Sequence, residues 1–377
     1  MSKWKTKVHS KKVIVAVFLD LKRAFETLDR SLMMKKLNKY GIRGVEAEWF
    51  LSYLSNRTQR TKIGEEVSDK IEVKLGVPQG AVLGTLLFII YINDIVSVLN
   101  HSEICLFADD TLLFVTGETA EECVRKMDSD LIKVQMYLEM NKLKLNATKT
   151  KAMVINGDTN LDIVVNNEVI EKVQNIKYLG VYVNNKLKFD VHIDYTCKKL
   201  AKKIGFLMRI RNKLDYQTSI NIYNTIIKPH FEYCSTILYL GTNQMCERLQ
   251  RLQNRAMRCI LKCERLTHSV LMLDSLMWLS VKQKVVFNVM MFIFKIKNNM
   301  LPIYLKRQLI NVSEVQPYLL RNNQDFRLPN LLSSASQNNL FYKGTKYFNS
   351  LPLKIKNEQN VIKFKKGLVE YIKGNVT

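Results

Sequence analysis

The stretch EICLFADDTLLFV, residues 103–115, decides how this chain is interpreted. Two apolar runs, ICLFA and TLLFV, are interrupted only by Asp109 and Asp110. This pattern predicts a tight antiparallel hairpin with two negative charges at its turn. An acidic pair between apolar runs is also the ordinary composition of a solvated turn. The pair therefore becomes informative only together with acidic residues elsewhere in the chain.

A second apolar element supplies such a residue. Val13 to Leu19 is a run of seven apolar residues rich in β-branched types, which predicts a buried strand ending at Asp20. By itself, an aspartate at this position is commonly a helix cap or a turn former. If the strand and the hairpin are neighbours in one sheet, Asp20, Asp109 and Asp110 converge at one edge and repel each other unless cations lie between them. Two Mg²⁺ ions about 3.5–4 Å apart would suit these oxygen ligands and the chemistry of phosphoryl transfer.

Between the two acidic elements lies GVPQGAVLG, residues 76–84, which places proline and glycines before a long apolar stretch, Leu86 to Val98. Glycines allow the backbone to approach a ligand closely, and the apolar stretch predicts a buried helix. A plain loop followed by a helix start is the alternative interpretation.

Three segments in this order, LDLKRAFETLD, GVPQGAVLGTLLFIIYINDI and FADD, resemble reverse transcriptases, closest to those of non-LTR (LINE-type, jockey-like) retrotransposons. The resemblance implies an RNA-directed DNA polymerase that extends a DNA primer with dNTPs on an RNA template. It implies that Asp20, Asp109 and Asp110 are catalytic residues that hold two Mg²⁺ ions, with Mn²⁺ as an alternative cofactor.

The same resemblance assigns roles to residues around the acidic set. Phe25 matches the aromatic steric gate that excludes a ribose 2′-hydroxyl. Gln79 and Gly80 fall in the loop that lies along the incoming nucleotide and the template. In NKLKLNATKTK, residues 141–151, Lys149 is expected to assist the pyrophosphate leaving group, with Lys151 as the alternative.

The pattern also departs from the family at several positions. Glu26 stands where aspartate is usual, Ala81 where serine is usual and Thr85 where proline is usual, and none of these removes a metal ligand. Only 19 residues precede Asp20, whereas the family has a fingers subdomain there, so the chain is expected to be N-terminally truncated. Loss of contacts from the fingers would cost several kcal/mol of transition-state stabilisation.

Nucleic-acid binding is expected from the resemblance and from charge. KYLGV, residues 177–181, resembles the primer grip, in which Leu179 and Gly180 would seat the 3′ end of the primer. The chain has 58 basic and 34 acidic residues, a formal charge of +24 that favours polyphosphate partners. Residues 195–260 contain twelve Lys or Arg and three acids. They include a predicted amphipathic helix whose basic stripe comprises Lys198, Lys199, Lys202 and Lys203. Membrane-surface binding is a weaker alternative, because exposed aromatic residues would usually accompany it.

The predicted fold class is α+β. A polymerase palm, a small, mostly antiparallel sheet with packed helices, is expected over residues 1–190, with the fingers largely missing. A helical thumb is expected over 191–265 and a tail of unknown role over 266–377. Helices are predicted at Leu32–Tyr40 with Asp29 or Ser31 as the N-cap, and at 128–141, 217–228 and 247–262.

Cysteine usage and hydropathy complete the expectations. Seven cysteines without paired spacing suggest a reducing compartment, and Cys259, Cys263 and His268 are interpreted as a helix face rather than a zinc site. No apolar run is long enough to span a bilayer, so the expected location is intracellular, in the nucleus or cytoplasm. A catalytically defective copy that only binds nucleic acid is the main alternative function, and a group II intron maturase is a weaker one.

Overall fold

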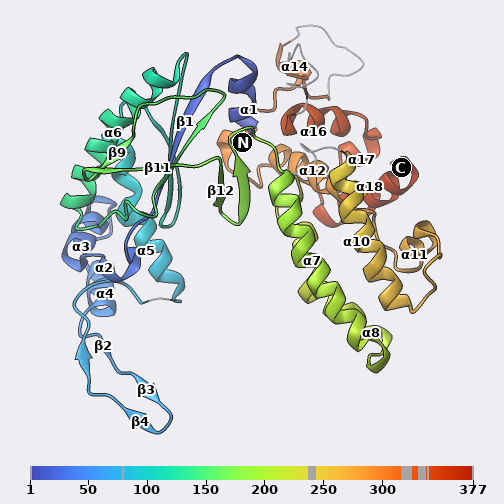
Figure 1. Cartoon of the computed structure of the whole chain (residues 1–377), viewed down its shortest axis with the longest axis horizontal. Helices are drawn as coiled ribbons and strands as arrows, with labels where there is room; N and C mark the ends of the chain where they lie inside the picture. The colour runs from blue at the N-terminus through green and yellow to red at the C-terminus, as the bar shows by residue number, and fades with distance from the viewer. Residues whose placement is uncertain are drawn as a thin grey trace. The chain divides into compact units, whose positions relative to one another are not determined.

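The computed structural model describes residues 2–78, 80–236, 243–315, 325–329, 337 and 339–375. Contacts divide the chain into two compact units (Figure 1). Residues 10–179 form the sheet unit, and residues 1–9 together with 180–377 form the helical unit. The sheet unit combines a five-stranded sheet with helices, so the predicted α+β class is confirmed. The expected palm, thumb and tail boundaries stay a prediction.

The sheet places the predicted strand at its centre. Its order is β11 (Glu171–Lys172), β8 (Lys151–Ile155), β1 (Val13–Leu19), β7 (Asp110–Gly117) and β6 (Glu103–Phe107). All neighbours are antiparallel except β11 and β8, which are parallel. Every residue of β1 is buried, because β7 and β8 flank it and helices cover the sheet. This environment explains the unbroken apolar run and confirms both predicted ends of the strand.

Helix α6 (Ala120–Met140) packs against β1 and β7. It begins eight residues before the predicted start, because the Thr119 side chain accepts a hydrogen bond from the Glu122 N–H at 3.2 Å and caps the helix. The fully buried Asp130 carboxylate accepts backbone N–H bonds from Asn100, His101 and Ser102 at 3.0, 2.9 and 2.6 Å. Burial alone would raise the pKa of Asp130, but these bonds lower it below its ordinary value. The carboxylate thereby fixes the chain that leads into β6.

The other helices of the sheet unit are α2 (Ala24–Thr27), α3 (Arg30–Lys39), α4 (Val45–Leu54) and α5 (Val82–Ile92), and α5 continues as a 3₁₀ helix over Asn93–Val98. The N-cap predicted for α3 is confirmed, since the Asp29 Oδ1 accepts a hydrogen bond from the Leu32 N–H at 2.8 Å. The buried helix expected over 86–98 begins earlier and is buried on one face only. Phe88 and Tyr91 lie in the core, whereas Val82 is 90% exposed.

A long arm, residues 56–75, connects α4 to the GVP segment. It consists of two small ladders, β2 (Thr58–Gln59) with β5 (Ile71–Glu72), and β3 (Lys62–Ile63) with β4 (Glu66–Val67). Figure 1 shows the arm extending away from the sheet, and residues 56–72 are all exposed. The sequence analysis did not predict it.

The helical unit contains two apolar cores. Its longer helices are α7 (Asp190–Ile210), α10 (Asn243–Leu261), α12 (Val281–Lys297), α16 (Leu340–Asn349) and α18 (Val361–Asn375). Its shorter helices are α1 (Ser2–His9), α8 (Tyr216–Ile222), a π-helical turn over Tyr223–Ile227, α9 (Lys228–Glu232), α11 (Ser269–Ser275), α13 (Ile303–Lys306), α14 (Val312–Val315) and α17 (Leu353–Lys356). The helices predicted near 217–228 and 247–262 are therefore confirmed. Within the described residues, no helix is both long and apolar enough to cross a membrane.

Gly76 combines a left-handed backbone conformation with a close approach to another segment of backbone. Its φ is +77°, and a Cβ there would lie 2.6 Å from the Glu26 carbonyl oxygen and 2.7 Å from that of Phe25. Gly64, in the arm, has a φ of +62°, but a Cβ at this position would meet no other atom within 4 Å. Both positions carry the conformational cost of a left-handed residue, and only Gly76 adds a backbone collision.

We expect Gly76→Ala to lower the free energy of unfolding by about 1–3 kcal/mol more than Gly64→Ala does, since strain and overpacking are added to the same φ penalty. Urea denaturation of both variants measures the difference. Equal losses would contradict the close approach of residue 76 to the backbone of residues 25 and 26.

Candidate active site

The register between β1 and β7 brings the acidic residues of two distant segments to one sheet edge. Each residue of β1 has a partner in β7, from Val13 with Gly117 to Leu19 with Thr111. The next position in this antiparallel register sets Asp20 against Asp110. Asp20 follows directly on a fully buried strand, so its location is fixed by the core of the sheet.

The second acidic segment is the turn between β6 and β7. Phe107 pairs with Asp110, which leaves Ala108 and Asp109 as the two turn residues. Ala108 has a φ of +52°, in the left-handed region that residues other than glycine rarely adopt. Asp109 and Asp110 are both exposed. The hairpin predicted from the sequence is therefore confirmed, and its turn presents two carboxylates to solvent beside Asp20.

The three carboxylates interact electrostatically. Burial, followed by the negative charges of Asp109 and Asp20, raises the pKa of Asp110 above its ordinary value. Like charges gathered at an exposed edge favour a cation, and carboxylate oxygens are the donors that Mg²⁺ prefers. Within the described residues, however, no three His, Cys, Asp or Glu side chains are spaced to enclose a metal ion. The donor set fits Mg²⁺ in its chemistry.

Two polar residues that sequence reasoning missed hold Asp20 in place. The Asn146 Nδ2 donates to the Asp20 Oδ2 at 3.0 Å, and the Asn146 N–H donates to the Asp20 carbonyl at 2.7 Å. The buried Thr150 hydroxyl accepts from the Asp20 N–H at 3.2 Å and donates to the Asn146 carbonyl at 2.9 Å. Both residues lie in NKLKLNATKTK, a segment in which the sequence predicts roles only for Lys149 and Lys151.

The two candidate lysines of this segment differ in their surroundings. Lys151 forms an ion pair with Glu171 at 2.7 Å and donates to the Thr148 carbonyl at 2.8 Å. Lys149 is exposed, in the turn that follows Asn146. The ion pair occupies the Lys151 ammonium, so Lys149 remains the better candidate for contact with a substrate.

The expected steric gate lies beside the GVP segment, which leads into the expected nucleotide loop. Phe25 is half-buried and packs against Phe88 of α5, with ring centroids 4.9 Å apart. The Val77 N–H donates to the Phe25 carbonyl at 2.9 Å, so the GVP segment is bonded to the gate residue through backbone. Gly80 is exposed with a φ of +79°. Gln79, the other residue expected to contact the nucleotide, lies outside the described residues.

Residues 2–183 match the family model described as "Reverse transcriptase (RNA-dependent DNA polymerase)". This part of the chain, just under half of its length, is similar to reverse transcriptase domains. The expected resemblance to this family is thereby confirmed.

Curated relatives come from non-LTR retrotransposons. The chain is 25% identical over 271 residues to "Probable RNA-directed DNA polymerase from transposon X-element" of Drosophila melanogaster, covering 69% of this chain and 29% of the relative. It is 24% identical over 268 residues to "RNA-directed DNA polymerase from mobile element jockey" of the same species, covering 67% and 29%. The chain thus spans less than a third of the length of these relatives. A telomerase structure from Candida albicans has a TM-score of 0.37 at 14% identity, covering 73% of this chain and 51% of that one, which is too low to support an inference.

Near the end of the sheet unit, a tyrosine lies close enough to Asp110 to interact with it electrostatically. The Tyr178 ring, at the end of β12 (Asn175–Tyr178), meets the Phe18 ring edge-on with centroids 5.3 Å apart. Burial, then Cys105 and Asp110, raise the pKa of Tyr178 to about 12. The residues expected to grip the primer come next: Leu179 has a φ of +45° and Gly180 a φ of +78°. The chain passes between the two units at this point, and the grip role stays a prediction.

The expected basic stripe lies on α7 of the helical unit. The face packed into the core comprises Leu200, Ile204 and Leu207, all buried. On the other side, the exposed lysines are Lys198, Lys199 and Lys202, whereas Lys203 is half-buried. Burial and the charges of Lys203 and Lys199 lower the pKa of His230 in α9. The amphipathic helix is confirmed, and its contact with nucleic acid stays a prediction.

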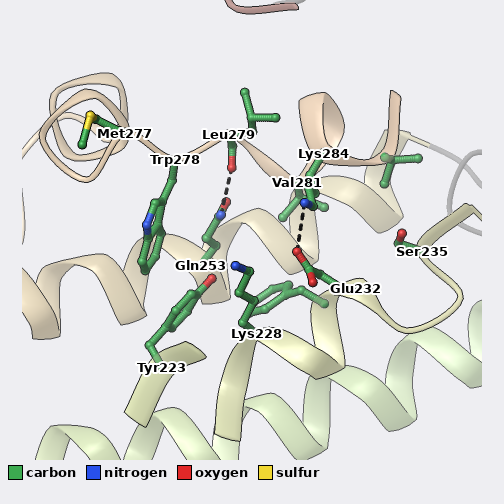
Figure 2. Close-up of a pocket in the computed structure, with 12 residues that line it drawn as sticks. Tyr223, Lys228, Glu232, Ser235, Gln253, Met277, Trp278, Leu279, Val281 and Lys284 are labelled. Carbon is green, nitrogen blue, oxygen red and sulfur yellow. Dashed lines mark hydrogen bonds and ion pairs between the residues drawn. The ribbon is translucent and has the colours of Figure 1, made fainter. Parts of the chain in front are cut away.

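A separate cavity of about 190 Å³ lies within the helical unit (Figure 2). One wall is the stacked pair Tyr223 and Trp278, whose ring centroids are 4.1 Å apart. The buried Gln253 donates from its Nε2 to the Leu279 carbonyl at 3.0 Å, while its Oε1 has no hydrogen-bond partner within the described residues. An ion pair between Lys284 and Glu232 at 3.0 Å closes another side. These contacts join α9, α10 and α12.

The raised pKa of Asp110 gives a pH-dependent prediction. Asp110 binds its proton more tightly in the folded state than in the unfolded state. The free energy of unfolding therefore falls as the pH rises from the pKa of the unfolded state, about 3.9, through the pKa of the folded state. We therefore expect Asp110→Asn to be more stable than the wild type at neutral pH and to lose this advantage in acid. Thermal unfolding in metal-free buffer across this pH range measures the effect.

The matched control is Asp162→Asn, which removes an exposed carboxylate elsewhere in the sheet unit. This variant should show no comparable gain at neutral pH. Destabilisation by Asp110→Asn at neutral pH would contradict the mutual repulsion of the three carboxylates.

Proposed function

We propose that this chain is an RNA-directed DNA polymerase that extends the 3′-hydroxyl of a DNA primer with dNTPs on an RNA template. The observation that supports it most strongly is the register of β1 with β7, which sets Asp20 beside Asp109 and Asp110. An aspartate set at an exposed sheet edge, in which the pKa of Asp110 is raised by burial and by its acidic neighbours, is typical of a functional site rather than of a structural turn.

In this proposal, Asp20, Asp109 and Asp110 hold two Mg²⁺ ions, with Mn²⁺ as a substitute. The ions would supply Lewis-acid stabilisation of the attacking and leaving oxygens. Asn146 orients Asp20, since its amide occupies the Asp20 Oδ2. The Asp20 Oδ1 then remains as the oxygen directed to a cation.

Other residues would select and position the substrates. Phe25 would exclude the 2′-hydroxyl, because its ring is held by Phe88 and its backbone by Val77. Gln79 and Gly80 would lie along the nucleotide and the template. Lys149 would donate a proton to the leaving pyrophosphate or stabilise its negative charge. Leu179 and Gly180 would seat the primer end, and the α7 lysines would contact the duplex backbone.

A second candidate function is nucleic-acid binding without polymerisation. The exposed lysines of α7 support it independently of the carboxylates. The net charge of +24 supports binding in either case.

The deciding experiment is Mg²⁺-dependent extension of a DNA primer on an RNA template at low salt. We expect Asp109→Ala to reduce extension by about a thousandfold, equivalent to roughly 4 kcal/mol of transition-state stabilisation. Template–primer binding should not weaken, because the substitution removes a negative charge.

Asp162→Ala serves as the control for loss of an exposed carboxylate. Extension that persists in Asp109→Ala would contradict the proposed site. Binding without any extension by the wild type would favour the second function.

A further inference from the structure

A polar cavity of about 700 Å³ lies where the arm meets the body of the sheet unit. Its cationic side chains are Arg30, Arg57 and Arg60, and Glu26 is the one acidic residue among the described residues that line it. The cavity thus has an excess of positive charge, which favours an anionic ligand.

Arg30 builds this cavity rather than binding in it. Its guanidinium donates to the carbonyls of Val73, Leu75 and Gly76 at 2.6, 3.1 and 2.9 Å. These bonds hold residues 73–76, which follow β5 at the end of the arm, against the first residue of α3. The base of the arm is therefore held in one place although residues 56–72 are exposed.

Arg57 and Arg60 are in a different situation. The Arg57 carbonyl accepts from the Val73 N–H at 2.8 Å, which fixes its backbone against the strand that Arg30 holds. Both arginine side chains are exposed and line the cavity. Burial and the charge of Arg57 lower the pKa of Arg30, and the charge of Glu72 opposes this only in part, so the Arg30 and Arg57 guanidinium groups are close enough to repel each other. An anion placed among them would relieve this repulsion.

The position of the cavity indicates which anion it takes. Gly76, Val77 and Pro78 line it, so it borders the loop expected to lie along the nucleotide and the template. None of Asp20, Asp109 and Asp110 is among the described lining residues, so the cavity is distinct from the edge where phosphoryl transfer would occur. A chain of phosphates running past the loop fits this location better than the triphosphate of the incoming nucleotide.

We propose that Arg57 and Arg60, at the base of the arm, bind the phosphodiester backbone of the single-stranded RNA template next to the nucleotide loop. This assignment rests on the proposed polymerase function for the identity of the strand. Guanidinium groups suit it because they form paired, charge-assisted hydrogen bonds with phosphate oxygens. The contact would be independent of base sequence.

The test is the salt dependence of single-stranded RNA binding, measured by fluorescence anisotropy without Mg²⁺, for Arg57→Gln/Arg60→Gln. Each phosphate contact to a single strand contributes about 0.7 to the slope of log K against log salt, so loss of two should reduce the slope by about 1.4. The matched control is Lys62→Gln/Lys70→Gln, which removes the same charge from exposed positions of the arm outside the cavity. We expect the control to reduce the slope by less than half as much.

A second measurement separates the strand from the nucleotide. In primer extension, the arginine variant should keep its KM for dNTPs at saturating template, while the template concentration that gives half-maximal extension rises. A raised dNTP KM with an unchanged RNA slope would overturn the proposal and assign the cavity to the triphosphate. Equal slopes for the arginine and lysine variants would overturn it as well, because RNA binding would then depend on the overall charge of the arm and not on the cavity.

The slope measurement does not depend on catalysis. If the wild type binds RNA but extends no primer, the polymerase function fails while the slope measurement still decides the arginine contact. Thermal unfolding of both double variants verifies that the arm substitutions leave the fold intact, and Arg57→Lys/Arg60→Lys should restore most of the slope.

Discussion

The antiparallel register of β1 with β7 is the constraint on which the candidate site depends. It joins segments about ninety residues apart and sets Asp20 against Asp110 without any direct bond between the two side chains. Because β1 is buried on both faces, a slip by one residue would move each side chain to the opposite face and disrupt its packing, so the core of the sheet enforces the position of the carboxylates. The mutual repulsion of the aspartates is thus imposed by hydrophobic packing.

A second constraint couples the loop after the arm to the expected steric gate. Gly76 lies so close to the backbone of Phe25 and Glu26 that no side chain fits, and its N–H donates to the Leu28 carbonyl at 2.7 Å. Gly84 has a similar role one turn into α5, where a Cβ would lie 2.6 Å from the Pro78 carbonyl. The two glycines hold the GVP segment between α2 and α5. Arg30 fastens the arm to the same place, so the arm, the loop and the gate form one connected structure.

The sequence allowed accurate prediction where the signal was local. The strand at Val13–Leu19 and the hairpin with its turn lie at the predicted residues. They could be predicted because the hydrophobic pattern of neighbouring residues indicates a strand directly. The predicted start of α6 is wrong because the helix begins at a cap that Thr119 and Glu122 form, eight residues before the predicted helix of residues 128–141. The arm gave no signal, since its strands are two residues long and fully exposed. Asn146 could not be found because its role depends on a bridge between Leu21 and Leu145, more than a hundred residues apart.

Direct titration with Mn²⁺, followed by electron paramagnetic resonance in the presence of template–primer, tests most directly whether the three carboxylates form a cation site. We predict bound Mn²⁺ that Mg²⁺ displaces and that is lost in Asp20→Asn/Asp109→Asn, but retained in Asp158→Asn/Asp162→Asn, which removes the same charge elsewhere in the sheet unit. Identical Mn²⁺ binding by the two double variants would contradict the account. The acidic pair of the hairpin would then be a solvated turn.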